Sequence, residues 1–103
     1  MIFINGTVEM SEAAQEILLP MICDAMTETH KEEGCMVYRF TRDLISPTVI
    51  HIVELWATEA ALKAHMQTPL FLTVVPMLNL HARVVSLTAR RGEFEEFDLI
   101  LPQ

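Results

Sequence analysis

The sequence predicts an α+β domain of ferredoxin-like topology that pairs with a second copy of itself. Three observations support this. Segments typical of strands and helices alternate in the split βαβ order of strand, helix, strand, strand, helix, strand. The segment 49–56 is apolar on both of its faces, which a sheet with one wet face does not need. Half of the residues are apolar and a fifth are charged, which is more apolar than a small monomer needs.

The first strand and the first helix follow from local patterns. Residues 2–10 alternate in polarity with a period of two, as a strand does. Ser11 is a typical N-cap residue and stands before a run of helix-forming residues that begins with Glu12. We expect this helix to run to Gly34, which would adopt the left-handed conformation after its last turn. Pro20 interrupts the pattern and predicts a kink or two abutting helices.

The middle of the chain predicts a hairpin and two more helices. Residues 35–42 and 49–56 are two antiparallel strands, joined by a turn that contains Ser and Pro. Thr58 is expected to cap a second helix that extends to Met66. Pro69 is suited to the first position of a short third helix, ending near residue 77 or 78.

The chain ends with a strand and a tail. Residues 81–90 predict the fourth strand, which completes a domain over residues 1–92. Because the helices of such a sheet lie on one face, we expect the other, apolar face to bind the second copy. The tail, residues 93–103, carries Phe94, Phe97 and Ile100 among acidic residues. Alone it has nothing to pack on, so we expect it to contact the partner protomer.

Charge and composition exclude several classes of partner. The formal charge is −7, from seven basic and fourteen acidic residues, and there is no basic run to attract nucleic acid or anionic lipid. No apolar run reaches the roughly 20 residues of a membrane-spanning helix. The first residues resemble no export signal. We therefore expect a soluble cytoplasmic protein in which Cys23 and Cys35 are reduced.

The usual cofactor motifs are missing. Three glycines, at positions 6, 34 and 92, allow neither a dinucleotide-binding fingerprint nor a phosphate-binding loop. The four histidines form no H-E-x-x-H motif, and no G-x-S-x-G sequence is present. We therefore expect no metal, flavin or nicotinamide cofactor.

A few polar residues interrupt apolar elements and are candidates for a site. They are Asn5, Tyr38, Glu54 with Trp56, and His65. Each has a plain structural explanation, since buried polar groups are normally hydrogen-bonded. We favour that explanation for Tyr38, Trp56 and Glu54. For His65 the two interpretations balance, because an imidazole beside an apolar cavity can act as an acid or a base near neutral pH.

Three segments resemble one known family. The segments 34–38 (GCMVY), 54–56 (ELW) and 61–71 (ALKAHMQTPLF) are similar to the patterns G-C-x-x-Y, E-x-W and A-L-x-A-H-x-x-T-P-x-F of the antibiotic biosynthesis monooxygenase family. The resemblance covers about residues 2–90, with order and spacing intact. It implies a dimeric α+β barrel with a pocket between sheet and helices in each protomer.

The resemblance suggests a cofactor-free reaction with dioxygen. A deprotonated phenol or quinol can itself give an electron to dioxygen, so the protein need supply only an apolar pocket, a base and fixed hydrogen bonds. His65 would be the base, and Asn5 and Tyr38 would orient the oxygens of a small aromatic, quinol or polyketide-like substrate. Trp56, Phe71 and Met77 would supply apolar walls.

Other functions stay open. The haem-degrading members of the family resemble this chain at Asn5, but they use a tryptophan in the second helix and an iron-binding histidine in the third. Here His65 lies in the second helix and His81 is predicted to lie beyond the third. The family also includes a sugar-phosphate isomerase. A dimer that binds a small ligand without transforming it belongs to a different class, and oxygen uptake with quinols would distinguish it from an oxygenase.

Overall fold

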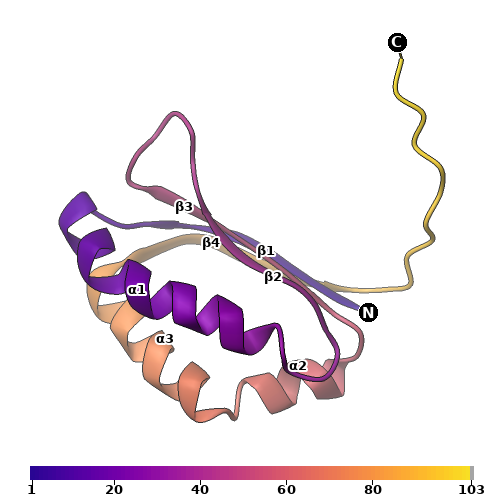
Figure 1. Ribbon diagram of the computed structural model, residues 1–103, viewed down its shortest axis with the longest axis horizontal. Helices are drawn as coiled ribbons and strands as arrows, with labels where there is room; N and C mark the ends of the chain where they lie inside the picture. Colours follow the sequence, from indigo (N-terminus) through magenta and orange to yellow (C-terminus); the bar gives the residue numbers. More distant parts are fainter. Residues whose placement is uncertain (103) are drawn as a thin grey trace.

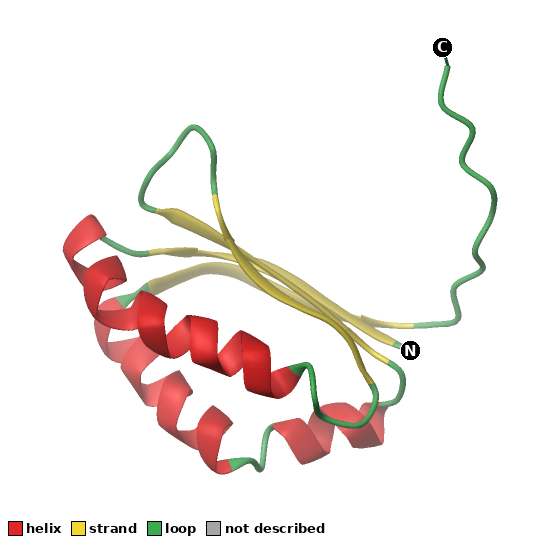
Figure 2. Cartoon of the chain, viewed as in Figure 1, coloured by secondary structure: helices red, strands yellow, loops and turns green. Residues whose placement is uncertain are grey.

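The computed structural model describes residues 1–102 and contains one antiparallel sheet with helices on one side (Figures 1 and 2). The strands lie in the order β2-β3-β1-β4, as the ferredoxin-like topology requires, so the predicted fold class is confirmed. In chain order the elements are β1 (Ile2–Glu9), α1 (Glu12–Thr29), β2 (Cys35–Arg42), β3 (Val49–Trp56), α2 (Glu59–His65), α3 (Pro69–His81) and β4 (Arg83–Arg91).

The alternation of β1 and β3 decides which side chains face the helices. On β1, Ile2, Ile4 and Val8 are buried, and on β3 the buried residues are Ile50, Ile52 and Trp56. They form two core clusters with residues of α1 and with Tyr38. The alternate residues, Asn5 among them, lie on the face that no helix covers; we call this the open face. Val49, Val53 and Leu55 of β3 lie there and are half-buried, so β3 is apolar on both sides, as predicted.

The first helix is a single element that ends earlier than predicted. The Ser11 hydroxyl accepts a hydrogen bond from the Ala14 amide at 3.1 Å, which confirms the cap. The helix continues through Pro20, which lies on its exposed side. It ends at Thr29 and not at residue 33, because residues 30–34 form turns. Gly34 has the predicted positive φ of 80°, but it serves the entry into β2, where its carbonyl accepts from the Ala57 amide at 2.8 Å.

The third helix is longer than predicted. It runs to His81, with Pro76 inside it, and not to residue 77 or 78. The Thr68 hydroxyl caps its start by accepting from the Phe71 amide at 3.2 Å. Apolar packing of its later turns explains the extra length, since Met77 and Leu78 contact the core cluster around Val8. His81 is therefore the last residue of this helix and does not lie beyond it.

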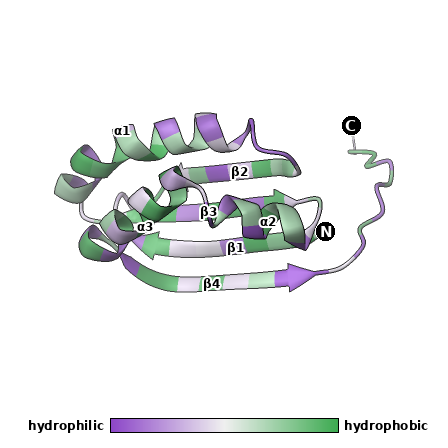
Figure 3. Ribbon diagram, turned by 90° about the horizontal axis from the view of Figure 1, so that it is seen from below, coloured by the Kyte–Doolittle hydropathy of each residue, from purple (hydrophilic) through white to green (hydrophobic). Residues whose placement is uncertain are grey.

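The fourth strand and the tail lie outside the cover of the helices. All residues of β4 are exposed, and Figure 3 shows this strand beside the area that the helices occupy. Residues 93–102 form no helix or strand and extend away from the sheet (Figure 1). Phe97, Leu99, Ile100 and Leu101 are exposed there. Within residues 1–102, no helix combines the length and the apolar character needed to cross a lipid bilayer.

Candidate functional site

His65 is buried where α2 meets α3. The Thr68 hydroxyl, which caps α3, also donates to the backbone carbonyl of His65 at 2.8 Å and so links the end of α2 to the start of α3. The imidazole lies among three aromatic rings, with centroid distances of 4.7 Å to Trp56, 5.1 Å to Phe71 and 5.3 Å to Tyr38. Only 3% of His65 is exposed. Because so little of the imidazole reaches bulk solvent, its hydrogen-bond partners come from the protein or from the contents of the space beside it.

Glu32 supplies one of these partners. Its Oε1 lies 3.0 Å and its Oε2 3.3 Å from His65 Nδ1. Because a carboxylate accepts hydrogen bonds, Nδ1 carries the proton and donates it, which leaves Nε2 of the neutral ring unprotonated. An imidazole fixed in this tautomer can take a proton at Nε2. Sequence reasoning missed Glu32, which lies in the turn after α1, and no spacing or motif links it to His65.

A cavity of about 210 Å³ lies between the sheet and the helices, next to His65. A buried apolar cavity of about 150 Å³ is enough to hold benzene, so this one has room for a single ring with small substituents. Its polar wall residues are Thr29, Tyr38, Glu54 and His65. The other wall residues are apolar: Ala25, Phe40, Ile52, Leu70, Phe71, Val74, Val75, Leu78 and Leu87.

Burial raises the pKa of two groups in the cavity wall, Glu54 and Tyr38. It raises the pKa of the Glu54 carboxyl, although the Trp56 indole, which donates to Glu54 Oε1 at 3.0 Å, and the charge of His65 act in the opposite direction. Burial also raises the pKa of the Tyr38 hydroxyl, and the carboxylates of Glu54 and Glu32 raise it further. Tyr38 is therefore a neutral hydrogen-bond donor at any physiological pH.

A surface groove of about 440 Å³ lies on the other side of Glu32. Its wall includes Glu32, Gly34, Ala57, Thr58 and Thr68. It is more open to solvent than the cavity, and neither the His65 imidazole nor any aromatic residue lines it. Because Glu32 lies at this groove and also contacts His65, it links the buried imidazole to the surface.

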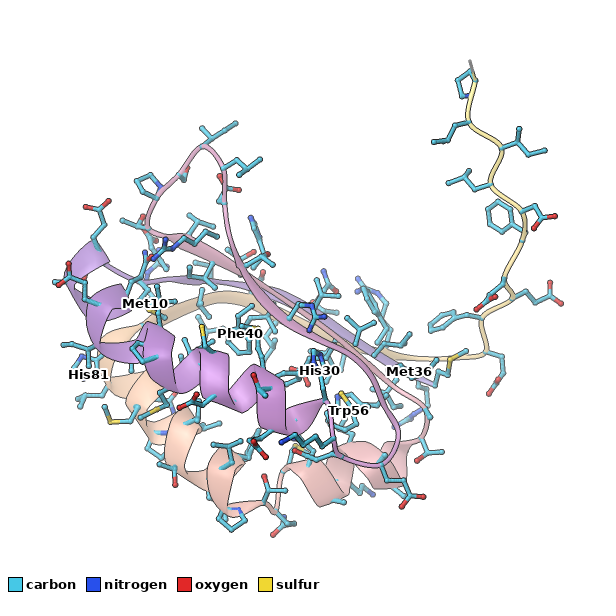
Figure 4. The ribbon with its side chains drawn as sticks, in the orientation of Figure 1. Met10, His30, Met36, Phe40, Trp56 and His81 are labelled. Atoms are coloured by element: carbon cyan, nitrogen blue, oxygen red, sulfur yellow. The ribbon has the colours of Figure 1, made fainter. Side chains whose placement is uncertain are left out.

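The structure brings together some of the residues predicted from the sequence. His65, Tyr38 and Phe71 line the cavity, and Trp56 packs against the imidazole. Met77 does not line the cavity; it packs against the core cluster around Val8. Figure 4 shows His81 at the opposite end of the helix layer from Trp56. His81 therefore lies far from His65.

Asn5 lies away from the cavity. It is on the open face and exposed, and its Oδ1 accepts a hydrogen bond from Arg90 at 3.0 Å. The period-two alternation of β1 explains this, because Asn5 shares a side with Phe3 and Thr7 and not with Ile4. Within residues 1–102, no group of three or more His, Cys, Asp or Glu side chains could hold a metal ion.

Comparisons with known proteins agree with this architecture. A protein from Deinococcus radiodurans, proposed to be an antibiotic biosynthesis monooxygenase, superposes with a TM-score of 0.84 at 23% identity, over 97% of this chain and 99% of that one. A protein from Bacteroides thetaiotaomicron, of unknown function and suggested to be an oxidoreductase, superposes with a TM-score of 0.79 at 26% sequence identity, over 86% of this chain and 94% of that one. A further structure, described as an antibiotic biosynthesis monooxygenase, superposes with a TM-score of 0.77 at 26% sequence identity, over 93% of this chain and 100% of that one.

The sequence itself gives the family. No curated protein matches the chain closely enough to count as a relative. Residues 1–76, well over half of the chain, match the sequence profile described as antibiotic biosynthesis monooxygenase. This match includes all three segments 34–38, 54–56 and 61–71. The chain belongs to the antibiotic biosynthesis monooxygenase family.

Proposed function

We propose that this protein is a cofactor-independent monooxygenase that oxidises a small phenol or quinol with dioxygen. The observation that carries the proposal is the buried His65 imidazole, which lines an apolar cavity while Glu32 holds its Nδ1 at 3.0 Å. The arrangement would provide a base shielded from bulk solvent, beside a space that fits one substituted ring. Family membership and structural neighbours named as monooxygenases support the same reaction class.

The proposed reaction needs no external reductant. His65 Nε2 takes the proton of the substrate hydroxyl, and the electron-rich anion gives an electron to dioxygen. A carbon–oxygen bond then forms, and the resulting peroxide accepts the proton back from His65. The oxygen–oxygen bond breaks as water leaves together with the hydrogen of the same carbon. A quinol thus becomes a hydroxyquinone, with one oxygen atom in the product and the other in water.

The other polar cavity groups would orient the substrate. Tyr38 stays protonated and donates a hydrogen bond. Glu54, whose carboxyl pKa is raised by burial, offers hydrogen-bonding oxygens beside it. Such fixed hydrogen bonds hold the reacting carbon in one position relative to dioxygen. Phe71 and the aliphatic residues of α3 would exclude water and so protect the anion from being reprotonated by solvent.

The proposal includes a homodimer. The apolar residues of the open face have no helix over them, and the tail exposes several large apolar side chains. A second protomer could cover both, which would reduce the apolar surface in contact with water. The cavity lies on the opposite side of the sheet from the open face, so each protomer would keep its own site.

Oxygen uptake with a panel of substituted phenols and quinols tests the function. The wild-type protein is expected to consume oxygen with at least one of them, and His65→Asn is expected to lower kcat by about 100-fold or more, because general-base catalysis is lost. His81→Asn changes a histidine far from the cavity and is the matched control. Unchanged turnover in His65→Asn would remove this residue as the base. A wild-type protein that binds quinols without consuming oxygen would be a ligand-binding dimer and not an enzyme.

A further inference from the structure

The Thr29 hydroxyl is buried and has no hydrogen-bond partner in the protein. Thr29 is the last residue of α1, it is 1% exposed, and it lines the cavity. Among the side chains of residues 1–102, its Oγ1 is the buried polar atom without a partner. Buried hydroxyl groups are normally paired, since an unpaired one costs free energy. Since Thr29 lines the cavity, a molecule in the cavity can supply the missing partner.

Other threonines in this chain show that a local partner is available to a helical threonine. Thr27, on the same helix, donates to the carbonyl of Cys23 at 3.1 Å, and Thr73 in α3 donates to that of Pro69 at 2.8 Å. Both are bonds to the residue four positions earlier, the usual solution for a threonine inside a helix. Thr29 makes no such bond and leaves its hydroxyl free.

Thr29 and His65 both line the cavity, and the turn after α1 links them. Its backbone carbonyl accepts a hydrogen bond from the Glu32 amide at 3.0 Å, and the Glu32 carboxylate lies 3.0 Å from His65 Nδ1. One short turn thus connects the unpaired hydroxyl to the residue that orients the base.

We propose that the Thr29 hydroxyl donates a hydrogen bond to the oxygen of a phenolic ligand in this cavity. The inference rests on the proposed function for the chemical class of the ligand, because a phenol oxygen near His65 becomes an anion once its proton is removed. A hydrogen bond to the anionic form favours that form and lowers the pKa of the bound phenol. Thr29 is then a positioning residue that also selects ligands with an oxygen at this end.

Binding of 4-nitrophenol in the absence of oxygen tests the inference. Its anion absorbs visible light, so one titration gives the dissociation constant and a pH series gives the pKa of the bound probe. Thr29→Val keeps the shape and removes the hydroxyl. We expect it to weaken binding by about 3- to 10-fold, the effect of one hydrogen bond, and to raise the pKa of the bound probe. Thr29→Ser keeps the hydroxyl, so its dissociation constant should stay within about twofold of the wild-type value and the pKa of the bound probe should match that of the wild type.

Thr27→Val is the matched control, because it removes an exposed hydroxyl of the same helix, and it should bind the probe as the wild type does. The melting temperature of each variant without ligand separates folding defects from binding defects. Equal affinity and equal bound-probe pKa in wild type and Thr29→Val would overturn the inference, and so would a wild type that binds no phenol.

The two proposals fail differently. If Thr29→Val weakens binding while no quinol supports oxygen uptake, the hydroxyl contact is correct and the oxygenase function is wrong. If quinols are oxidised with the same KM in wild type and Thr29→Val, the function is supported and the hydroxyl contact is wrong.

Discussion

At the scale of single residues, the pair of His65 and Glu32 is the chemically most informative contact. The imidazole packs among three aromatic rings, and one carboxylate lies within hydrogen-bond distance of it. Since Glu32 is 22% exposed in its side chain, a proton taken up by His65 in the proposed reaction would have a short route to the surface. The same contact would then both orient the proposed base and connect it with solvent.

Changing Glu32→Gln tests this role. The amide keeps the size of the side chain but removes its charge, so it no longer stabilises the imidazolium that forms when His65 takes a proton. We expect kcat to fall on the order of 10- to 100-fold, with a smaller change in KM, because the loss arises after substrate binding. Glu33→Gln, an exposed neighbour, should keep wild-type kcat. If Glu32→Gln kept the same kcat as Glu33→Gln and the wild type, His65 would not depend on the Glu32 carboxylate for catalysis.

Glu54 makes the stability of the fold depend on pH. Its folded-state pKa lies above the ordinary value of 4.5 because of burial. The raised pKa of Glu54 therefore contributes fully to the free energy of unfolding below about pH 4.5, and this contribution is lost as pH rises through the folded-state pKa. Glu54→Gln keeps an acceptor for the Trp56 indole and cannot ionise. We expect its melting temperature to fall less than that of the wild type between pH 4 and pH 8. Parallel curves would contradict the raised pKa.

The residues of the site differ in how far the sequence could predict them. Three residues, His65, Tyr38 and Phe71, could be predicted because they lie in the segments 34–38 and 61–71 that resemble the family. Glu32 and Thr29 were not, since their roles arise from the turn after α1, where a contact spans 33 residues. Asn5 lies on the open face because the alternation of β1 puts it on the side opposite to Ile2, Ile4 and Val8, which face the helices.

At the scale of elements, the strands were predicted more accurately than the helices. The bounds of β2 and β3 agree with the pattern because β-branched and aromatic runs end at turn residues. The helices α1 and α3 each contain a proline, and both continue through it. Their apolar contacts with the sheet outweigh the lost backbone hydrogen bond, and such tertiary packing does not appear in local propensity.

The connection between β2 and β3 depends on Asp43. Its Oδ2 accepts from the amides of Ile45 and Ser46 at 3.0 and 2.8 Å, and its Oδ1 lies 2.8 Å from His51 Nε2. These bonds, that of His51 first, lower the pKa of the Asp43 carboxyl from 3.8 to about 2. The stabilisation is present above about pH 3.8 and is lost as pH falls toward 2.

We expect Asp43→Ala to loosen this connection without unfolding the sheet. The amides of Ile45 and Ser46 lose their acceptor, so their hydrogen exchange should become about 10-fold faster or more. The amides of β1 should exchange as before, which makes them the internal control. Unchanged protection in the connection would show that backbone geometry alone holds it. Below about pH 2 the wild type should approach the behaviour of the variant.

At the scale of the whole molecule, the sheet has one covered face and one open face. The helices bury one side of β1 and β3, and the apolar residues on the other side have only neighbouring strands beside them. The same face also carries polar groups: Arg83 pairs with Glu9, Arg90 pairs with Asn5, and Arg39 lies beside Val53. Protein–protein interfaces combine apolar side chains with polar ones in this way.

Val53→Glu tests the proposed dimer directly. Val53 lies on the open face in the middle of the sheet, paired with Asn5 of β1 on one side and Arg39 of β2 on the other. In a monomer the new carboxylate would point into water and cost little. In a dimer formed through this face the carboxylate would be buried in the contact in place of an apolar side chain, so we expect the mass measured by sedimentation to fall from two chains to one. Ile17→Glu, which places the same charge on an exposed apolar position of α1, should leave the mass unchanged. Two chains in the Val53→Glu variant would mean that the open face is not the contact between protomers.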